Sequence, residues 1–240
     1  MNDNYNRAPA AFEAGAARSL TQTGFINRVF GWMTAGLALT GAISYGIAHS
    51  SMSEFVLAHP GTYLLLILLE LGVVIGLSAA INRISAAVAT LGFLLFAVLN
   101  GITLSWIFLA YEPSSIYATF FVTSGTFGGV GLFGWLTKRD LSGIGGICGM
   151  ALWGLILASI VNFFWTNSAV SLIISYAGVV IFVGLTAWDM QKIKQLSFAV
   201  EDGDVETELG KKLAIFGALE LYLDFVNLFL YILRIFGNRR

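Results

Sequence analysis

The chain has 240 residues, of which 57% are hydrophobic and only 11% carry a charged side chain. A soluble domain of this length needs about 25% charged residues to cover its surface, so the composition excludes a soluble globular protein and indicates an integral membrane protein. The net charge of −1 is uninformative in that setting. The expected surroundings are membrane lipids, and no nucleic-acid partner is predicted.

The amino-terminal segment, 1–26, precedes the first apolar run and contains no apolar core of signal-peptide length. The first apolar run is therefore predicted to be an uncleaved membrane anchor. We divide the chain into an amino-terminal tail, 1–26, and a single membrane domain, 27–238.

Seven apolar runs follow the tail, each of about the 20 residues that a helix needs to cross a bilayer. Lipid offers the backbone no hydrogen-bond partners, and the period-two pattern of a membrane strand is missing, so the predicted fold class is an all-α integral membrane protein with seven transmembrane helices. The runs lie near residues 29–48, 62–81, 86–110, 115–137, 142–165, 170–190 and 213–236.

Lys and Arg residues predict the orientation of these runs. With a cytoplasmic amino terminus, the three outer loops hold no Lys or Arg. Seven full crossings then place Arg234, Arg239 and Arg240 outside, against the rule, and the alternative is a re-entrant last helix. We favour the full crossing, because ten other charges already set the topology. These ten are Arg7, Arg18, Arg28, Arg83, Lys138, Arg139, Lys192, Lys194, Lys211 and Lys212.

The second run contains Glu70, an acid inside apolar sequence. An ionisable residue at the bilayer centre costs about 2.5–3.5 kcal/mol on insertion scales, so it normally faces the bundle interior and has a partner. Glu70 is either a lining residue of an ion pathway or a protonated, hydrogen-bonded packing residue. Arg83, just past this run, is the nearest counter-charge. In the third run, Asn100, Thr103 and Ser105 are predicted to make helix contacts.

Glycines cluster in the fourth run, at 125, 129 and 134, and in the fifth, at 145 and 149. Small residues at four-residue spacing let helix backbones approach closely, so these positions are predicted to be helix contacts. The stretch GIGGICG, 143–149, has no preceding strand and no following Lys-Ser/Thr, which excludes a phosphate-binding loop. Cys148, the single cysteine, is predicted to be buried in this run.

The sixth and seventh runs carry the remaining acids. Asp189 ends the sixth run beside two lysines and is either an interfacial acid paired with one of them or a functional group. In the seventh run, Glu220, Asp224, Asn227 and Tyr231 follow steps of four, three and four, so they share one helix face. Lipid cannot surround that stripe, so the seventh helix must lie against other helices there. Asp224 is the best candidate for a proton or cation role; the other three fit packing equally well.

Three stretches together resemble one known family. NGITLSWIFLAY, GVVIFVGLTAWDMQKIKQL and ALELYLDFVNLFLYILRIFG are similar to the Bax-inhibitor family of seven-helix membrane proteins, and the short charged tail is similar to its bacterial branch. The resemblance covers essentially the whole chain. It implies six helices surrounding a central seventh, a place in the bacterial inner membrane, and a pH-dependent calcium leak.

The resemblance also implies site residues. In the family, one acid from the sixth helix and one from the seventh form a hydrogen-bonded pair that senses protons; here these are Asp189 and Asp224, which would also ligate calcium transiently. An Arg that latches to the pair corresponds to Arg83. Glu70 sits where related proteins often have an acid, and Glu70, Glu220 and Asn227 are candidate ion-pathway residues. Calcium is expected as the transported ion, with no cofactor.

The predicted spans place these two acids at different depths. Asp224 is near the middle of its run, whereas Asp189 ends its own about ten residues from the centre, which is roughly 15 Å of helix. The pair can meet only if the seventh helix is shifted toward the cytoplasm or tilted.

The resemblance implies two possible functions, and the residues argue against intramembrane proteolysis. The first is a pH-sensitive calcium or cation leak, and the second is binding and modulation of a membrane-anchored ATP-dependent protease through the amino-terminal tail. Intramembrane aspartyl proteases use Tyr-Asp and Gly-x-Gly-Asp sequences, which the contexts of Asp189 and Asp224 do not match. A membrane serine protease needs a His inside a span, and neither His lies in one. The chain is not expected to be an enzyme.

Overall fold

The structure is a computed structural model that describes residues 7–52, 60–81, 83–200 and 207–240. Across these ranges the regular elements are helices, and one isolated bridge joins Tyr111 to Arg239. The predicted all-α fold class is therefore confirmed. The helices are α1 (Arg7–Ala48), α3 (Pro60–Ala80), α4 (Ala86–Leu104), α5 (Trp106–Ala110), α6 (Pro113–Leu136), α7 (Ser142–Phe164), α8 (Ser168–Ala199) and α9 (Glu208–Phe236).

Six stretches of the described helices are long and apolar enough to cross a membrane. They match the second to seventh predicted runs, with α4 and α5 together forming the third. The first predicted run, 29–48, is the carboxyl-terminal part of α1, and its Thr, Ser and Gly residues dilute its apolar character. The prediction of seven spanning helices is thus confirmed for six.

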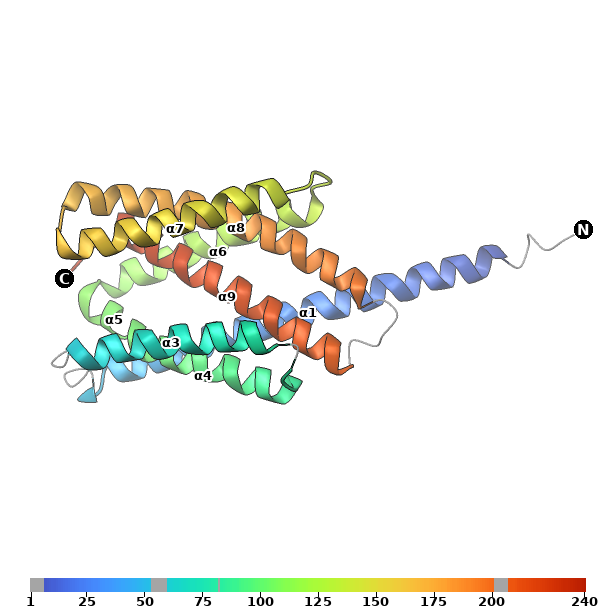
Figure 1. The fold of residues 1–240 in the computed structure, drawn as a ribbon, viewed down its shortest axis with the longest axis horizontal. Helices are drawn as coiled ribbons and strands as arrows, with labels where there is room; N and C mark the ends of the chain where they lie inside the picture. The colour runs from blue at the N-terminus through green and yellow to red at the C-terminus, as the bar shows by residue number, and fades with distance from the viewer. Residues whose placement is uncertain (1–6, 53–59, 82, 201–206) are drawn as a thin grey trace, which may run out of the picture.

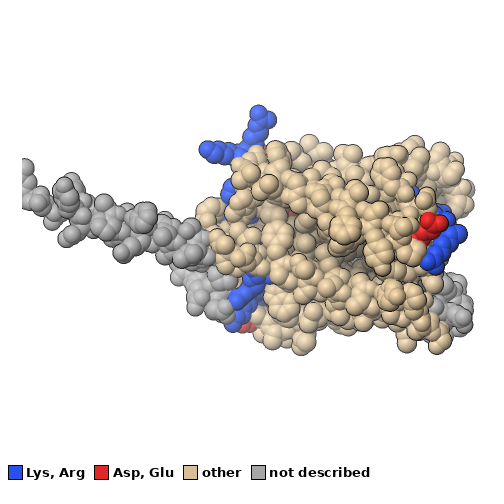
Figure 2. All heavy atoms as spheres, turned by 180° about the vertical axis from the view of Figure 1, so that it is seen from behind, with Lys and Arg blue, Asp and Glu red and all other residues tan. Residues whose placement is uncertain are grey.

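On one face of the molecule (Figure 2), charged side chains gather at the two ends of the bundle. On the face drawn in Figure 2, the Lys, Arg, Asp and Glu side chains lie almost entirely at either end, and uncharged residues cover the middle. This distribution is the one that a bilayer imposes, because charges are costly in its hydrocarbon core.

Three helices extend beyond the apolar runs that predicted them, and one of these is α9, which begins at Glu208 rather than near residue 213. The described part of the tail belongs to α1, which begins at Arg7 and projects from one end of the bundle (Figure 1). Helix α8 does not end near residue 190 but continues to Ala199. Its extension keeps one buried face, with Met190, Ile193 and Ser197 inside, while the half-buried lysines between them reach polar groups of α9 and α6. The apolar run ended at those lysines, but the helix did not.

Helix α9 is the most buried of the six apolar helices. It packs against α1, α4, α6 and α8, whereas α3 lies chiefly on α4 and α7 chiefly on α8 (Figure 1). Its Leu221, Tyr222, Leu228 and Leu233 are among the largest side chains that are fully enclosed. An arrangement of six helices around a central seventh stays a prediction, since α3 and α7 lie in an outer position.

The end of α9 is tied to the link between α5 and α6. The backbone N–H of Glu112 donates to the carbonyl oxygen of Asn238 at 3.0 Å, and that of Arg240 donates to Ala110 at 3.0 Å. Asn238 also donates its backbone N–H to the Ser115 hydroxyl at 3.0 Å. Helix α9 therefore runs from one end of the bundle to the other and does not turn back, as expected for the full crossing rather than the re-entrant alternative.

The glycines of α6 and α7 divide into two groups. A Cβ added at Gly134 would overlap the backbone of Ala187 in α8, and one added at Gly145 would overlap the Trp188 ring. At the other three positions, 125, 129 and 149, a Cβ would meet nothing within 4 Å. The prediction of close helix contacts is correct for Gly134 and Gly145 and wrong for the other three, because four-residue spacing does not say which neighbour, protein or lipid, a helix face meets.

Candidate functional site

The polar stripe of α9 faces α8. Asp224 lies against Asp189, Glu220 pairs with Lys192, and Tyr231 stacks on Phe182 with ring centroids 5.9 Å apart. The stripe therefore lies against another helix, as predicted.

Asp189 and Asp224 meet although their predicted depths differed. Because α8 continues to Ala199, Asp189 lies well inside its helix rather than at the end. The two side chains are enclosed by protein, with 8% and 4% of their surfaces exposed. Helix α9 also runs obliquely across the bundle (Figure 1), so the tilt that the sequence required is present, and the limit assigned to the sixth helix was too short.

The carboxyl groups of Asp189 and Asp224 contact each other, and the Thr186 hydroxyl lies beside Asp224. The Thr186 hydroxyl also donates to the carbonyl oxygen of Phe182, one turn earlier, at 2.7 Å. Oδ2 of Asp224 is buried and has no hydrogen-bond partner within the described part of the chain. A direct carboxyl–carboxyl hydrogen bond needs one proton between the two groups, so this arrangement suits a pair that shares a proton.

Lys192 supplies the positive charge of the cluster. Its ammonium group forms an ion pair with Oε1 of Glu220 and lies 5.4 Å from the ring centroid of Trp188 and 5.3 Å from that of Phe216. The sequence left open a pair between Asp189 and a neighbouring lysine, but in the structure Lys192 pairs with Glu220 instead. Sequence reasoning left Lys192 out of the site. Its three-residue spacing from Asp189 could have placed it there.

Glu70 belongs to a second polar group, which joins α3 to α4. It accepts hydrogen bonds from Asn100 Nδ2, at 3.1 Å, and from the Thr103 hydroxyl. The Tyr222 hydroxyl donates to Asn100 Oδ1 at 3.0 Å and lies 2.6 Å from the Thr40 hydroxyl, so α1 and α9 are joined to the same group. The predicted helix contacts of Asn100 and Thr103 are thus present. Tyr222 was missed, since it lies off the stripe of α9.

Arg83 is not in contact with the carboxyl pair. It lies exposed in the turn between α3 and α4. That turn sits beside the start of α9, where Lys212 Nζ donates to the carbonyl oxygen of Ile84 at 3.1 Å. Asp224 comes twelve residues after Lys212 in α9, which is roughly 18 Å along the helix. Arg83 as a latch on the pair therefore stays a prediction that would need this turn to move.

Asn227 makes a local contact. Its Nδ2 donates to the carbonyl oxygen of Leu223, one turn earlier, at 2.8 Å. This bond satisfies the amide inside its own helix, and the role of Asn227 as a pathway residue stays a prediction.

A resident metal cage is not present in the parts of the chain that the structure describes. No three or more His, Cys, Asp or Glu side chains converge there as metal ligands do. Calcium takes six to eight oxygen ligands, and Asp189 and Asp224 supply at most four. Any calcium bound by this pair would keep most of its water or take other ligands.

Comparison with known proteins gives a consistent result. Residues 22–240 match the family model described as "Inhibitor of apoptosis-promoting Bax1". The chain is 46% identical over 236 residues to "Inner membrane protein YbhL" of Escherichia coli (strain K12), covering 98% of this chain and 100% of that protein. It is 40% identical over 222 residues to an uncharacterized protein of Borreliella burgdorferi, covering 92% and 94%. An uncharacterized protein of Rickettsia prowazekii is 37% identical over 216 residues, covering 90% of each chain.

Proposed function

The chain belongs to the Bax inhibitor family of membrane proteins, and from this premise we propose that it is a pH-sensitive cation leak gated by Asp189 and Asp224. The name of the Escherichia coli relative and the six apolar helices support a multi-pass protein of the inner membrane. The observation that carries the gate is the enclosed pair of carboxyl groups between α8 and α9.

The gate works through one proton. With that proton shared, the pair of Asp189 and Asp224 carries a single negative charge and a hydrogen bond holds α8 to α9. Without it, two like charges face each other, and at 4 Å and an effective dielectric constant of 20 their repulsion is on the order of 4 kcal/mol. The hydrogen bond that is lost with the proton involves a charged group and contributes about 1.5–3 kcal/mol. Loss of the proton therefore removes an attraction and adds a larger repulsion, which separates the helices. Rising pH therefore opens the leak, and falling pH closes it.

The open state offers a path for a hard cation. Ionised Asp189 and Asp224 present oxygen ligands, which calcium prefers, and Glu220 extends the acidic face by one turn of α9. Glu70 and Asn227 are further candidates along the path. The proposed route runs between the two ends of the bundle and passes the carboxyl pair between α8 and α9.

Calcium flux into liposomes that hold the purified protein tests this function. Flux is measured from pH 5 to 8 for the wild type, for Asp189→Asn, for Asp224→Asn and for the double variant. Asn keeps a hydrogen bond but removes the charge, so each single variant should lose the rise in flux with pH, and the double variant should add little because the two residues act as one unit. Asp140→Asn, in the exposed link before α7, is the matched control and should keep the wild-type profile.

Two further outcomes are informative. Arg83→Ala should raise flux at low pH if Arg83 latches the pair, and should leave the profile unchanged if it does not. If both single Asn variants keep the wild-type pH profile, the gate is refuted. Modulation of a membrane-anchored ATP-dependent protease would then be the leading function, testable by deleting residues 2–20 and measuring association with that protease.

A further inference from the structure

A seam separates α1 from α6 along the bundle. Helix α1 packs on α4, α5, α8 and α9, and α6 packs on α8 and α9, but within the described ranges the two helices share no comparable interface. Two hollows occupy the seam, of about 370 Å³ and about 690 Å³. Gly128 lines both, so they adjoin at this residue. Their floor is Met190 of α8 and Phe225 of α9.

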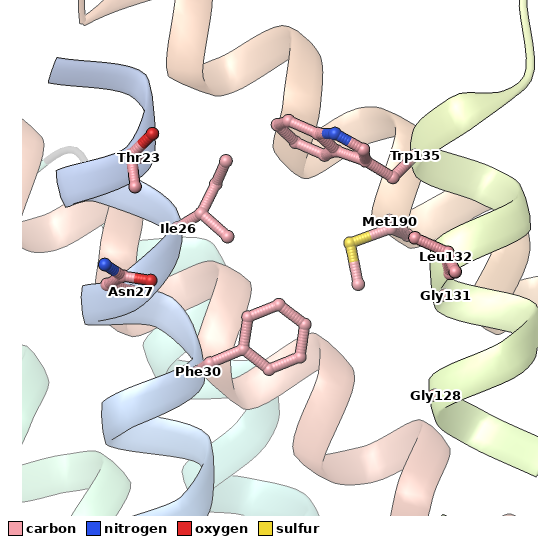
Figure 3. Close-up of a pocket in the computed structure, with 9 residues that line it drawn as sticks. All are labelled: Thr23, Ile26, Asn27, Phe30, Gly128, Gly131, Leu132, Trp135 and Met190. Carbon is pink, nitrogen blue, oxygen red and sulfur yellow. The ribbon is translucent and has the colours of Figure 1, made fainter. Parts of the chain in front are cut away.

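Both hollows are mainly apolar, and the smaller one has polar side chains at one end. In the smaller hollow, Thr23 and Trp135 lie at one end, with Asn27 one turn further along α1, and Phe30 and Gly128 lie at the other end (Figure 3). The larger hollow is lined mainly by aliphatic and aromatic side chains. The seam therefore has a polar mouth at one end of the bundle and an apolar body that continues toward the other.

Positive charge lies beside the polar mouth. Lys194 Nζ donates to the carbonyl oxygen of Trp135 at 2.6 Å and lies 5.4 Å from its ring centroid. Lys138 and Arg139 follow Trp135 by three and four residues, and both are exposed. Asp140 is the acid next to them, and its carboxyl group accepts the backbone N–H of Ser142 at 2.9 Å. The net charge of these four side chains is therefore positive.

We propose that this seam binds one phospholipid with an anionic headgroup. One acyl chain lies along the apolar body, and the phosphate lies at the mouth formed by Thr23, Asn27 and Trp135. The volumes fall within the range of small-molecule sites, about 300–1,000 Å³.

The preference of this site for one lipid over another must come from its headgroup and its shape, because the surrounding bilayer is also apolar. An acyl chain gains no hydrophobic energy on leaving surrounding lipid for the seam, because both are apolar. Selection must come from shape and from the headgroup. Juxtamembrane Lys and Arg residues attract anionic lipids, so Lys138 and Arg139 favour a phosphatidylglycerol over a phosphatidylcholine with the same chains, by roughly thirtyfold. This binding is independent of the proposed ion flux.

Gly128 allows a sharp test. A Cβ added at Gly128 would meet nothing within 4 Å, so the side chain of Gly128→Leu can enter the seam where the two hollows adjoin and obstruct both. Gly129 is the matched control: it is the next residue, its Cβ would also meet nothing within 4 Å, and it lines neither hollow. Ser124→Leu, which intrudes into the larger hollow alone, is a second filling variant in case the first does not fold.

Binding is measured by native mass spectrometry in detergent micelles titrated with phosphatidylglycerol or phosphatidylcholine. The wild type and Gly129→Leu should retain one phosphatidylglycerol, whereas Gly128→Leu and Ser124→Leu should lose it. Replacing Lys138 and Arg139 together by Gln should abolish the preference between headgroups. Equal retention in the filling variants and the wild type would overturn the site. So would equal binding of the two lipids by the wild type, or a second copy of the chain cross-linked across the seam.

Discussion

Gly134→Ala tests the close approach of α6 to α8. The added Cβ would overlap the carbonyl oxygen of Ala187 and come to 3.0 Å from its carbonyl carbon and 3.1 Å from its Cα. All three atoms are backbone, so no rotamer change relieves the contact, and the helices must separate by at least a few tenths of an ångström. Overpacking of this kind costs about 1–3 kcal/mol. Ala187 is two residues before Asp189, so the carboxyl pair would move as well.

The matched control is Gly125→Ala in the same helix, where the Cβ meets nothing within 4 Å. Both substitutions gain the same helix propensity, up to about 1 kcal/mol, so the difference between the two variants isolates the contact at Gly134. Thermal unfolding in detergent, followed by the loss of the monodisperse species, should place Gly134→Ala below Gly125→Ala by roughly 2–4 °C for each kcal/mol. Equal midpoints would refute the close contact.

Other contacts give further expectations. Tyr222→Phe removes a fully buried hydroxyl with two polar partners and should destabilise the protein by about 1–3 kcal/mol in the same unfolding assay; wild-type stability would contradict the network. Lys192→Met leaves Glu220 without its ion-pair partner and should lower the free energy of unfolding by about 1–3 kcal/mol, a modest loss because one-third of the lysine side chain is exposed. Adding Glu220→Gln should recover most of that stability. Strictly additive losses in the double variant would argue against a direct pair. Cys148 is half-buried against α8, so a charged thiol reagent should label it slowly in intact membranes and quickly after denaturation, and rapid labelling in membranes would mean that α7 borders water. Topology reporters at Glu112 and Lys138 should report the outer and the cytoplasmic side, and the same side for both would contradict the crossing of α6.

Sequence reasoning predicted what depends on helical periodicity. The four- and three-residue steps from Glu220 to Tyr231 lie on one face of any helix, so the stripe and its burial against a neighbour followed directly. The partner of Asp224 came instead from the family resemblance, because periodicity says which residues share a face but not which helix that face meets. Tyr222 escaped notice for the same reason, since its partners belong to α1 and α4.

Hydropathy predicted neither the full length of the sixth helix nor the partners of its charged side chains. It ended the sixth helix at the lysines, although a lysine stem can lie along an apolar surface while its ammonium group reaches a partner or water. In α8, Lys192 reaches Glu220 and Lys194 reaches the carbonyl oxygen of Trp135, so the helix continues to Ala199. The depth at which Asp189 sits depended on that limit, and only the packing of α8 against α9 could supply it.

The position of α9 at the heart of the packing has a consequence for biosynthesis. A chain is made from its amino terminus, so α1, α4, α6 and α8 leave the ribosome before the helix that they all pack against. Until α9 arrives, their inner faces, the Asp189 carboxyl group among them, have no partner from that helix. Assembly of the bundle is therefore expected to finish only after the last helix has been inserted. A nascent chain that stops before Glu208 should be recognised by membrane quality control as incomplete, however well its earlier helices have entered the bilayer.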